Sequence, residues 1–407
     1  MAEMADYFDT RLRRRAPGVY IEDVAPDQAA MFRTGVPVFV GFARQNGQAD
    51  EKDEDTKFFR LTRWEQFAQR VGHAAPEGFL ADAVRGFFEN GGECCVVVPL
   101  WVSGDSQSSG VLQEQLRDVF RTDEDGRRGF LEDIEDTDLV CVPDIMMEGI
   151  GSDQDVVFDL QQQVLKYCED LGDRFAILDV GPTTDIQLAI QHWRELLPPE
   201  GALYYPWIKN RTGKWIPPCG HIAGIYARTD AQVGVHKAPA NEIVEGATDL
   251  AMRLTDEEQS RLNDVGVNCL RSFPGRGIRV WGARTLNGLP SWRYVNVRRL
   301  FLTLIRWIEH NMHDLVFEPN SPPLWERVRG RLGSYCNQLF ERGALKGREP
   351  NEAFFVKCDA ETNPPMVRET GQLICEIGLA PLTPAEFIIV RITQSAAGAA
   401  VTGPVGA

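Results

Sequence analysis

Two residue pairs in this sequence are of types that occur in catalytic or metal-binding sites, but each pair lacks something that such a site needs. Cys219 and His221 are a potential nucleophile and base, but side chains so close in the chain rarely reach the required geometry. No G-x-S-x-G motif occurs that would supply another nucleophile. His310 and His313 stand one helical turn apart and could share a metal ion, yet zinc needs three or four ligands and no further His or Cys cluster supports them. The sequence therefore predicts no catalytic residue and no metal site.

Motifs for nucleotide binding are also incomplete. The run 275–277 begins like a dinucleotide-binding loop, but Val280 stands where the third glycine belongs. The pair 213–214 resembles the end of a phosphate-binding loop, but Trp215 replaces the Ser or Thr. The acidic run that starts at Asp123 lacks the glutamate that a calcium-binding EF-hand needs at its last position. We therefore expect no cofactor, and the enzyme hypothesis has no positive support.

The composition is that of an acidic globular protein. The 407 residues include 43 basic and 59 acidic side chains, which gives a formal net charge of −16. This length suggests two or three domains with sizeable cores. The acidic balance argues against a nucleic-acid partner, because phosphate binding requires basic side chains. No apolar run approaches the roughly 18–20 residues of a membrane span, so direct membrane insertion is not expected, and the first residues do not read as a signal peptide.

Nine cysteines occur at irregular spacing, without a C-x-x-C motif, and most lie inside apolar runs. This usage is typical of reduced, buried thiols in a protein made in the cytosol.

Strand and helix patterns alternate through the middle of the chain. This alternation predicts an α/β fold with substantial parallel pairing. Apolar runs that read as buried strands are separated by helical stretches. The expected strands are 36–42, 94–100, 138–144, 174–180 and 202–208, and the expected helices include 153–171 and 184–197.

The C-terminal half has the clearest helix, at 297–312, where apolar residues recur at helical spacing. A second helix is expected to start at Leu324, and strands are expected at 353–358, 372–379 and 386–393. Segment 293–348 carries ten basic and five acidic residues, whereas segment 104–160 carries sixteen acidic and four basic residues. The molecule could therefore have two electrostatic faces, although plain solvation explains each charged run as well.

A set of phrases spread over the chain carries a family resemblance. In order they are PGVYIEDV (17–24), PPCGHIAGIYARTD (217–230), GVHKAPAN (234–241), GRGIRVWGARTL (275–286), WRYVNVRRLF (292–301) and PAEFIIVRI (384–392). In this order and spacing, the sequence resembles the contractile tail sheath proteins of phages and phage-tail-like injection particles. The apolar runs of the middle segment are similar to the inserted domain of that family. Each phrase alone is weak evidence for this family, but the ordered set is specific to it.

The resemblance implies a mixed α/β (α+β) fold in which the two ends of the chain form one conserved sheath domain and the middle is inserted into it. Extended arms leave at both ends. The expected boundaries are an N-terminal arm at 1–26, a tube-proximal domain at 27–45 and 209–384, an inserted outer α/β domain at 46–208, a C-terminal arm strand at 385–394 and a disordered tail at 395–407.

The function implied by the resemblance is structural and not enzymatic. Sheath subunits polymerise as helically stacked rings of six around an inner tube, and the sheath contracts to drive the tube through a target envelope. The implied partners are further copies of the chain, the inner tube protein, and baseplate and cap proteins. Assembly is expected in the bacterial cytoplasm, as part of a phage tail or a released phage-tail-like particle. Two alternatives stay open: a non-contracting or cap-proximal sheath paralogue, and an acidic soluble α/β enzyme.

The resemblance also implies which residues join subunits. The arms add strands to a neighbour's sheet, where backbone hydrogen bonds supply affinity and alternate side chains fill pockets. The expected contacts are Val19, Tyr20, Ile21, Glu22 and Val24 in the N-terminal strand, and Phe387, Ile388, Ile389, Val390, Arg391 and Ile392 in the C-terminal strand. The alternative is that both strands pair within their own chain, as most strands do.

Three arginines of the predicted helix 297–312 could contact the tube. In the family this helix lies near the tube-facing wall, so Arg298, Arg299 and Arg306 could meet an acidic tube surface or serve neighbouring sheath subunits. The acidic stretch 104–138 matches no phrase of the family and could be an outward surface or a docking site.

Overall fold

The computed structural model of the chain describes residues 33–44, 57–75, 77–102, 108–121, 131, 134, 136–196, 200–386, 391–395 and 398–402. The predicted N-terminal strand Val19–Val24 and residues Phe387–Val390 of the predicted C-terminal strand lie outside the described residues. No helix in the described part is long and apolar enough to cross a membrane.

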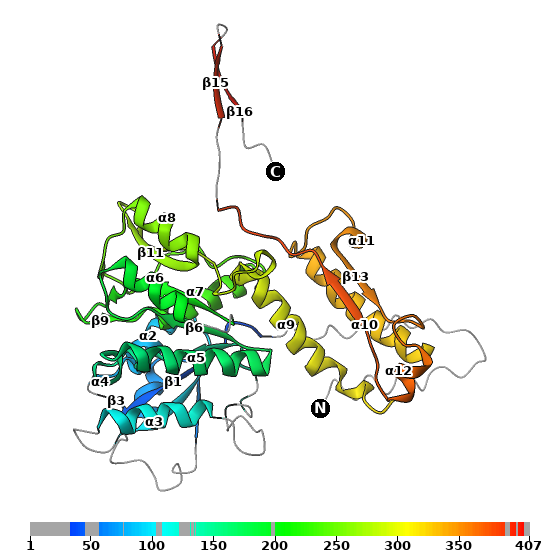
Figure 1. Ribbon diagram of the computed structural model, residues 1–407, viewed down its shortest axis with the longest axis horizontal. Helices are drawn as coiled ribbons and strands as arrows, with labels where there is room; N and C mark the ends of the chain where they lie inside the picture. Colours follow the sequence, from blue (N-terminus) through cyan, green and yellow to red (C-terminus); the bar gives the residue numbers. More distant parts are fainter. Residues whose placement is uncertain are drawn as a thin grey trace, which may run out of the picture. The chain divides into compact units, whose positions relative to one another are not determined.

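A nine-stranded sheet runs through residues 37–281 (Figure 1). Its order is β12-β11-β7-β6-β5-β1-β4-β2, and β3 pairs with the end of β1. The strands from β4 through β1, β5, β6 and β7 to β11 are parallel, whereas β2 and β12 are antiparallel to their neighbours. The bounds are β1 (Pro37–Arg44), β2 (Phe59–Leu61), β3 (His73–Ala74), β4 (Cys95–Trp101), β5 (Leu139–Cys141), β6 (Phe175–Asp179), β7 (Gly201–Tyr205), β11 (Val267–Phe273) and β12 (Gly277–Trp281).

The inner strands are buried on both faces. Every residue of β5, β6 and β7 is buried, so these segments can be apolar throughout rather than alternating with polar residues. The predicted strands 94–100, 138–144, 174–180 and 202–208 correspond to β4, β5, β6 and β7, and their parallel pairing is confirmed.

Helices cover the sheet, and two of them pack unusually closely. A Cβ atom on Gly220 of α7 would lie 2.2 Å from the carbonyl oxygen of Ala83 in α2. One on Gly224 would lie 2.4 Å from the carbonyl oxygen of Phe87, so α2 and α7 can approach only because glycine occupies both positions. The helices are α2 (Leu80–Glu89), α3 (Ser109–Phe120), α4 (Glu148–Gly151), α5 (Gln154–Leu171), α6 (Ile186–Glu195), α7 (Cys219–Gln232) and α8 (Asp256–Val265).

Several short elements complete this part of the chain. Strands β8, β9 and β10 form a small antiparallel sheet, and the β8–β9 loop is held on α2 by hydrogen bonds from Asn210 and Lys214 to Asp82. The strands are β8 (Ile208–Lys209), β9 (Trp215–Ile216) and β10 (Asp249–Leu250), and single helical turns occur at Phe67–Val71, Pro143–Met146, Pro290–Trp292 and His313–Leu315.

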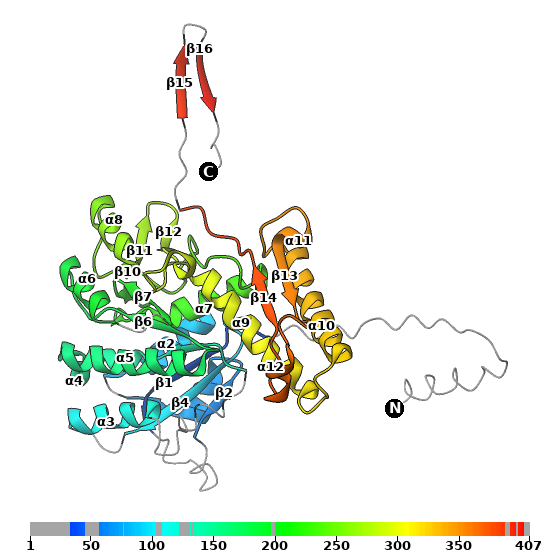
Figure 2. The ribbon, with the colours of Figure 1, turned by 45° about the vertical axis from the view of Figure 1, so that its right-hand side comes forward.

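The elements after residue 294, drawn in Figure 2, contribute most of a second, smaller hydrophobic core, to which Val235 also belongs. It contains α9 (Val295–Met312), α10 (Pro322–Glu341), α11 (Pro350–Ala353), β13 (Phe354–Lys357), α12 (Pro365–Glu369) and β14 (Glu376–Leu379). Leu300 of α9 and Leu339 of α10 contribute to this core, and Trp307 stacks on Tyr335 with ring centroids 4.3 Å apart. The helix predicted at 297–312 and the helix predicted from Leu324 are both confirmed.

The C-terminal end contains a hairpin that the sequence did not predict. Strands β15 (Arg391–Ser395) and β16 (Gly398–Thr402) pair antiparallel. Strand β16 lies within residues 395–407, for which the sequence predicted disorder. Strand pairing uses backbone groups, which a segment rich in glycine and alanine possesses like any other.

The predicted inserted domain at 46–208 is not separate from the rest of the fold. Strand β1 comes from the predicted segment 27–45, but it pairs with β4 and β5 from the predicted insertion. At the other side, β7 pairs with β11, which comes from the segment 209–384. One sheet and one large hydrophobic core thus contain residues from all three predicted segments.

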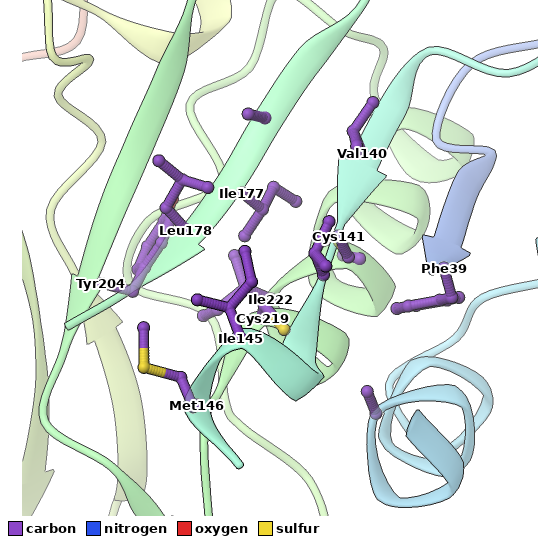
Figure 3. Close-up of a cluster of buried hydrophobic side chains, with 14 of the residues drawn as sticks. Phe39, Val140, Cys141, Ile145, Met146, Ile177, Leu178, Tyr204, Cys219 and Ile222 are labelled. Atoms are coloured by element: carbon purple, nitrogen blue, oxygen red, sulfur yellow. The ribbon is translucent and has the colours of Figure 1, made fainter. Parts of the chain in front are cut away.

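The large core contains most of the cysteines. Figure 3 shows Cys141 of β5 and Cys219 of α7 among apolar side chains from β5, β6, β7 and α7. Eight of the nine cysteines are buried, and only Cys375 is half-buried. These thiols behave as small apolar side chains, as the sequence predicted.

One buried carboxyl group should make the stability depend on pH. Asp179, at the end of β6, is 3% exposed, and its Oδ1 atom has no hydrogen-bond partner. Burial raises the pKa of this carboxyl group to about 7, opposed by hydrogen bonds from Cys219. The native chain therefore binds more protons than the unfolded chain between about pH 4 and pH 7, so Asp179 reduces stability as pH rises through that window.

We expect Asp179→Asn to raise the free energy of unfolding at pH 8 and to leave it nearly unchanged at pH 4. Urea unfolding at pH 4, 6 and 8 measures the difference between variant and parent chain. The control is Asp118→Asn, which changes an exposed aspartate of α3. Equal stability of the parent chain and Asp179→Asn at every pH would contradict the raised pKa of Asp179 and its effect on stability.

Candidate functional site

The residues that suggested catalysis are packing residues. Cys219 is fully buried, so its thiol is out of reach of a substrate, and burial also raises the pKa of that thiol. His221 is 2% exposed and its Nδ1 atom has no hydrogen-bond partner. Among the described residues, no group of three His, Cys, Asp or Glu side chains could hold a metal ion.

The most elaborate polar arrangement is centred on Arg299 of α9. Its Nη2 atom donates to Asp138 Oδ2 at 2.9 Å and to Asp230 Oδ2 at 2.6 Å. Its Nη1 atom donates to Asp230 Oδ1 at 2.9 Å, and the Arg299 and Asp230 side chains are both 2% exposed. Burial alone would lower the pKa of Arg299, but the two carboxylates outweigh that effect and raise it. We call Arg299, Asp138 and Asp230 the arginine junction.

The junction also holds the start of the first strand. Asp138 Oδ2 accepts the backbone N–H of Gly35 at 3.0 Å, and Oδ1 accepts that of Val36 at 2.7 Å. Gly35 has φ +74°, and a Cβ atom there would lie 2.5 Å from the Cα atom of Ala227. The chain can therefore enter β1 along this path only with glycine at position 35.

Two further arginines connect α9 to the rest of the chain. Arg298 donates to both carboxylate oxygens of Glu200, at 2.6 and 2.8 Å, and its guanidinium lies 5.1 Å from the ring centroid of Trp292. Arg306 is 4% exposed, and its Nη1 atom lies 3.5 Å from the carbonyl oxygen of Arg33. Helix α9 thus contacts segments that are far apart in the sequence.

Arg298, Arg299 and Arg306 are the residues that the sequence offered as possible contacts with a tube surface or a neighbouring subunit. Arg299 and Arg306 are buried inside the subunit, and Arg299 could reach another protein only by leaving two buried carboxylates. Arg298 is paired with Glu200 and its side chain is 18% exposed. In the sequence these residues looked like a basic helix face because their acidic partners lie far away in the chain.

A second ionic contact holds the segment that leads to the C-terminal hairpin. Arg284 donates through Nε to Glu386 Oε1 at 2.9 Å and through Nη2 to the other carboxylate oxygen. Asn296 donates to the carbonyl oxygens of His236 and Leu382, at 2.7 and 3.0 Å. The chain is therefore fixed up to Glu386. Of the predicted contact residues in the C-terminal strand, Arg391 and Ile392 fall in β15.

Strands β13 and β14 form a sheet of only two strands, so in the described residues each has a single neighbour (Figure 2). Phe355 of β13 is 57% exposed, and it borders a groove of about 480 Å³ between α10, α11 and β13. The ring of Phe355 lies over its cross-strand partner Gly378, where a Cβ atom would lie 2.1 Å from the ring. This sheet combines unpaired edges with an exposed aromatic side chain and an adjacent groove.

Comparison with known proteins identifies the chain. Residues 129–286 match the family model for the central domain of phage tail sheath proteins, and residues 289–395 match the model for their C-terminal domain. The chain is also 30% identical to a protein in the PVC sheath complex of an extracellular contractile injection system, in the contracted state. That likeness covers 94% of this chain and 98% of the other, with a TM-score of 0.69. The chain belongs to the phage tail sheath family.

Two further similar proteins differ in how much of their length is matched. A chain of the anti-feeding prophage baseplate in the contracted state is 26% identical, with a TM-score of 0.77, and the likeness covers 94% of this chain and 99% of that one. The tail sheath protein of Vibrio phage KVP40 is 26% identical over 194 residues, which are 47% of this chain. The match covers 28% of that phage protein, so this chain spans less than a third of its length.

The family domains show what the arginine junction connects. Arg298 and Arg299 belong to the sheath C-terminal domain, whereas Asp138, Glu200 and Asp230 belong to the sheath central domain. The arginine junction is thus one of the ionic contacts between the two domains of a sheath protein, together with Arg298–Glu200 and Arg284–Glu386. Members of this family are structural sheath proteins and not enzymes.

Proposed function

We propose that the chain is the force-transmitting subunit of a contractile sheath. Subunits polymerise as helically stacked rings of six around an inner tube, and the sheath contracts to drive the tube through a target envelope. The observation that carries this proposal is the likeness over 94% of the chain to a protein of a contracted sheath complex.

The arms join subunits by adding strands to a neighbour's β13–β14 sheet. The donated strands are Val19–Val24 and Phe387–Ile392, and the support for their acceptor is the two-stranded sheet with its exposed Phe355. About five backbone hydrogen bonds per strand, at about 0.5–1.5 kcal/mol each, contribute on the order of 3–7 kcal/mol. Exposed ion pairs contribute only about 0–1 kcal/mol each. Strand junctions therefore survive contraction while polar contacts between rings rearrange, and because the contacts are heterologous they build a filament.

The proposed partners are the inner tube protein and the baseplate and cap proteins. Assembly takes place in the bacterial cytoplasm, within a phage tail or a phage-tail-like particle. The likeness to a chain of the anti-feeding prophage baseplate favours a second candidate, a sheath paralogue located next to the baseplate.

The acceptor assignment predicts the effect of one surface substitution. Phe355→Asp should leave thermal stability nearly unchanged, because the ring is 57% exposed in the single chain. The same change should prevent sheath assembly, because a charge would be placed where the donated strand packs. Sedimentation velocity of parent chain and variant measures assembly, and thermal unfolding measures stability. The control is Val316→Asp, which changes a 56% exposed apolar residue in the turn after α9. Assembly of Phe355→Asp at parental levels would exclude this sheet as the acceptor.

Negative-stain electron microscopy of the purified chain, expressed alone and then with the candidate tube protein, tests the function. Hollow, cross-striated cylinders of uniform diameter are expected. Cylinders that form only with the tube protein would show that assembly needs a template. Short stacks that stop growing would favour the paralogue next to the baseplate, and discrete particles under both conditions would contradict the sheath function.

A further inference from the structure

Two thiols lie opposite each other where the β13–β14 ladder ends. The last pair of the ladder joins Lys357 to Glu376, and the chain continues to Cys358 on one strand and back to Cys375 on the other. The same register places Cys358 directly opposite Cys375. Opposed residues of antiparallel strands have Cα atoms about 4.5–5.5 Å apart, which lies within the range of about 4.4–6.8 Å found for disulfides. Burial raises the pKa of both thiols, and each thiol also influences the pKa of the other, which agrees with their close approach.

The surrounding residues fix this pair. Asn363 donates to the carbonyl oxygen of Ile374 at 2.9 Å, and its Oδ1 atom accepts the backbone N–H of Ile374 at 2.8 Å. The Nδ2 atom of Asn363 also lies 3.9 Å from the Sγ atom of Cys358. One amide side chain therefore ties the residue before Cys375 to the neighbourhood of Cys358.

We propose that Cys358 and Cys375 form a site for an intramolecular disulfide, made by exchange with a low-molecular-weight disulfide such as oxidised glutathione. Cys375, the half-buried thiol, loses its proton and attacks the glutathione disulfide, which forms a mixed disulfide and releases one glutathione thiol. Cys358 then loses its proton and attacks the sulfur of Cys375, which releases the second glutathione. Two protein thiols are oxidised, one glutathione disulfide is reduced, and the two protons end on the two glutathione thiols. This inference does not depend on the proposed sheath function.

Exposure distinguishes this pair from the other close thiols of the chain. Cys141 and Cys219 also lie close together, but both are fully buried in the large core (Figure 3). Cys336 of α10 lies near Cys375 but is fully buried as well. Only the pair 358–375 combines opposition across two strands with a member that is partly accessible to an oxidant.

Peptide mapping by mass spectrometry after treatment with oxidised glutathione tests the site. The folded full-length chain is treated in one arm, and the denatured chain is refolded in a glutathione redox buffer in a second arm, so that slow access to the thiols does not decide the result. We expect a disulfide between Cys358 and Cys375 and loss of two of the nine free thiols, while Cys141 and Cys219 stay available for alkylation after denaturation.

Variants and outcomes complete the test. Cys375→Ser and Cys375→Ala should keep all eight remaining thiols reduced, and circular dichroism checks that both variants fold. A 358–375 linkage in either arm supports the proposal. Reduced thiols in both arms, a mixed disulfide on Cys375 that Cys358 never resolves, or linkage of Cys375 to Cys336 would overturn it.

Discussion

A chain that begins at Arg33 is expected to fold and to stay monomeric where the full-length chain forms sheath cylinders. The described fold starts at this residue, and Asp138 fixes the following backbone through Gly35 and Val36, so no element of the large sheet is lost. The deletion removes the proposed donated strand Val19–Val24, whose backbone bonds alone contribute on the order of 3–7 kcal/mol to each subunit contact. Sedimentation velocity and negative-stain microscopy at matched concentration measure the loss of assembly.

The matched control is a chain that ends at Glu386 and therefore keeps the N-terminal arm. It should also fail to build cylinders, because the second donated strand is missing. Mixed with the chain that begins at Arg33, it should form no more than small oligomers. Thermal unfolding shows whether each truncated chain stays folded. Normal cylinders from the chain that begins at Arg33 would mean that Val19–Val24 is not needed between subunits.

Replacement of Arg299 by leucine is expected to destabilise the subunit by about 3–5 kcal/mol, because it leaves Asp138 and Asp230 buried without a cation. Lysine should rescue only part of this loss, since a single ammonium group cannot reproduce the paired geometry of a guanidinium. Urea unfolding at pH 7 measures the free energies. Arg331→Leu is the control, because its partner Asp314 is exposed and such pairs contribute about 0–1 kcal/mol.

A double replacement separates the unpaired charges from the lost packing of the arginine. Adding Asp230→Asn to Arg299→Leu removes one of the two carboxylates that are left buried without a cation, so the combined variant should be more stable than Arg299→Leu alone. Measured losses for Arg299→Leu and Arg331→Leu that agree within error would show that the junction does not hold the two domains together.

The local patterns of the sequence predicted the elements well. The pattern of apolar residues predicted strands β4 to β7 and helices α5, α9 and α10. A strand buried on both faces is a continuous apolar run, and a helix buried on one face has apolar residues at helical spacing. The order of the strands in the sheet has no such pattern in the sequence. Strand β1 precedes β4 by some fifty residues and β5 by about a hundred, yet it lies between them, so the domain boundary was drawn through a continuous sheet.

The arginine junction could not be predicted for a related reason. Arg299 follows Arg298 on a helix with an apolar stripe, and a buried arginine has the same neighbours in sequence as an exposed one. What decides its burial is the presence of Asp138 and Asp230, which reach it only through the folding of the sheet and α7. The family phrases did include positions 228–230 and 298–299 together, so the resemblance covered both sides of the contact without indicating that they meet.

The central position of β1 has a mechanical consequence. The strand follows directly on the segment fixed by Asp138, and it is hydrogen-bonded to β4 on one side and to β5 on the other, in parallel with both. Tension along β1 must therefore shear two ladders at the same time, whereas tension on an edge strand can peel its bonds one after another. A pull delivered through the N-terminal arm would reach the subunit at a strand that is paired on both sides. Under load, the arm should therefore detach from the neighbouring subunit before its own subunit unfolds.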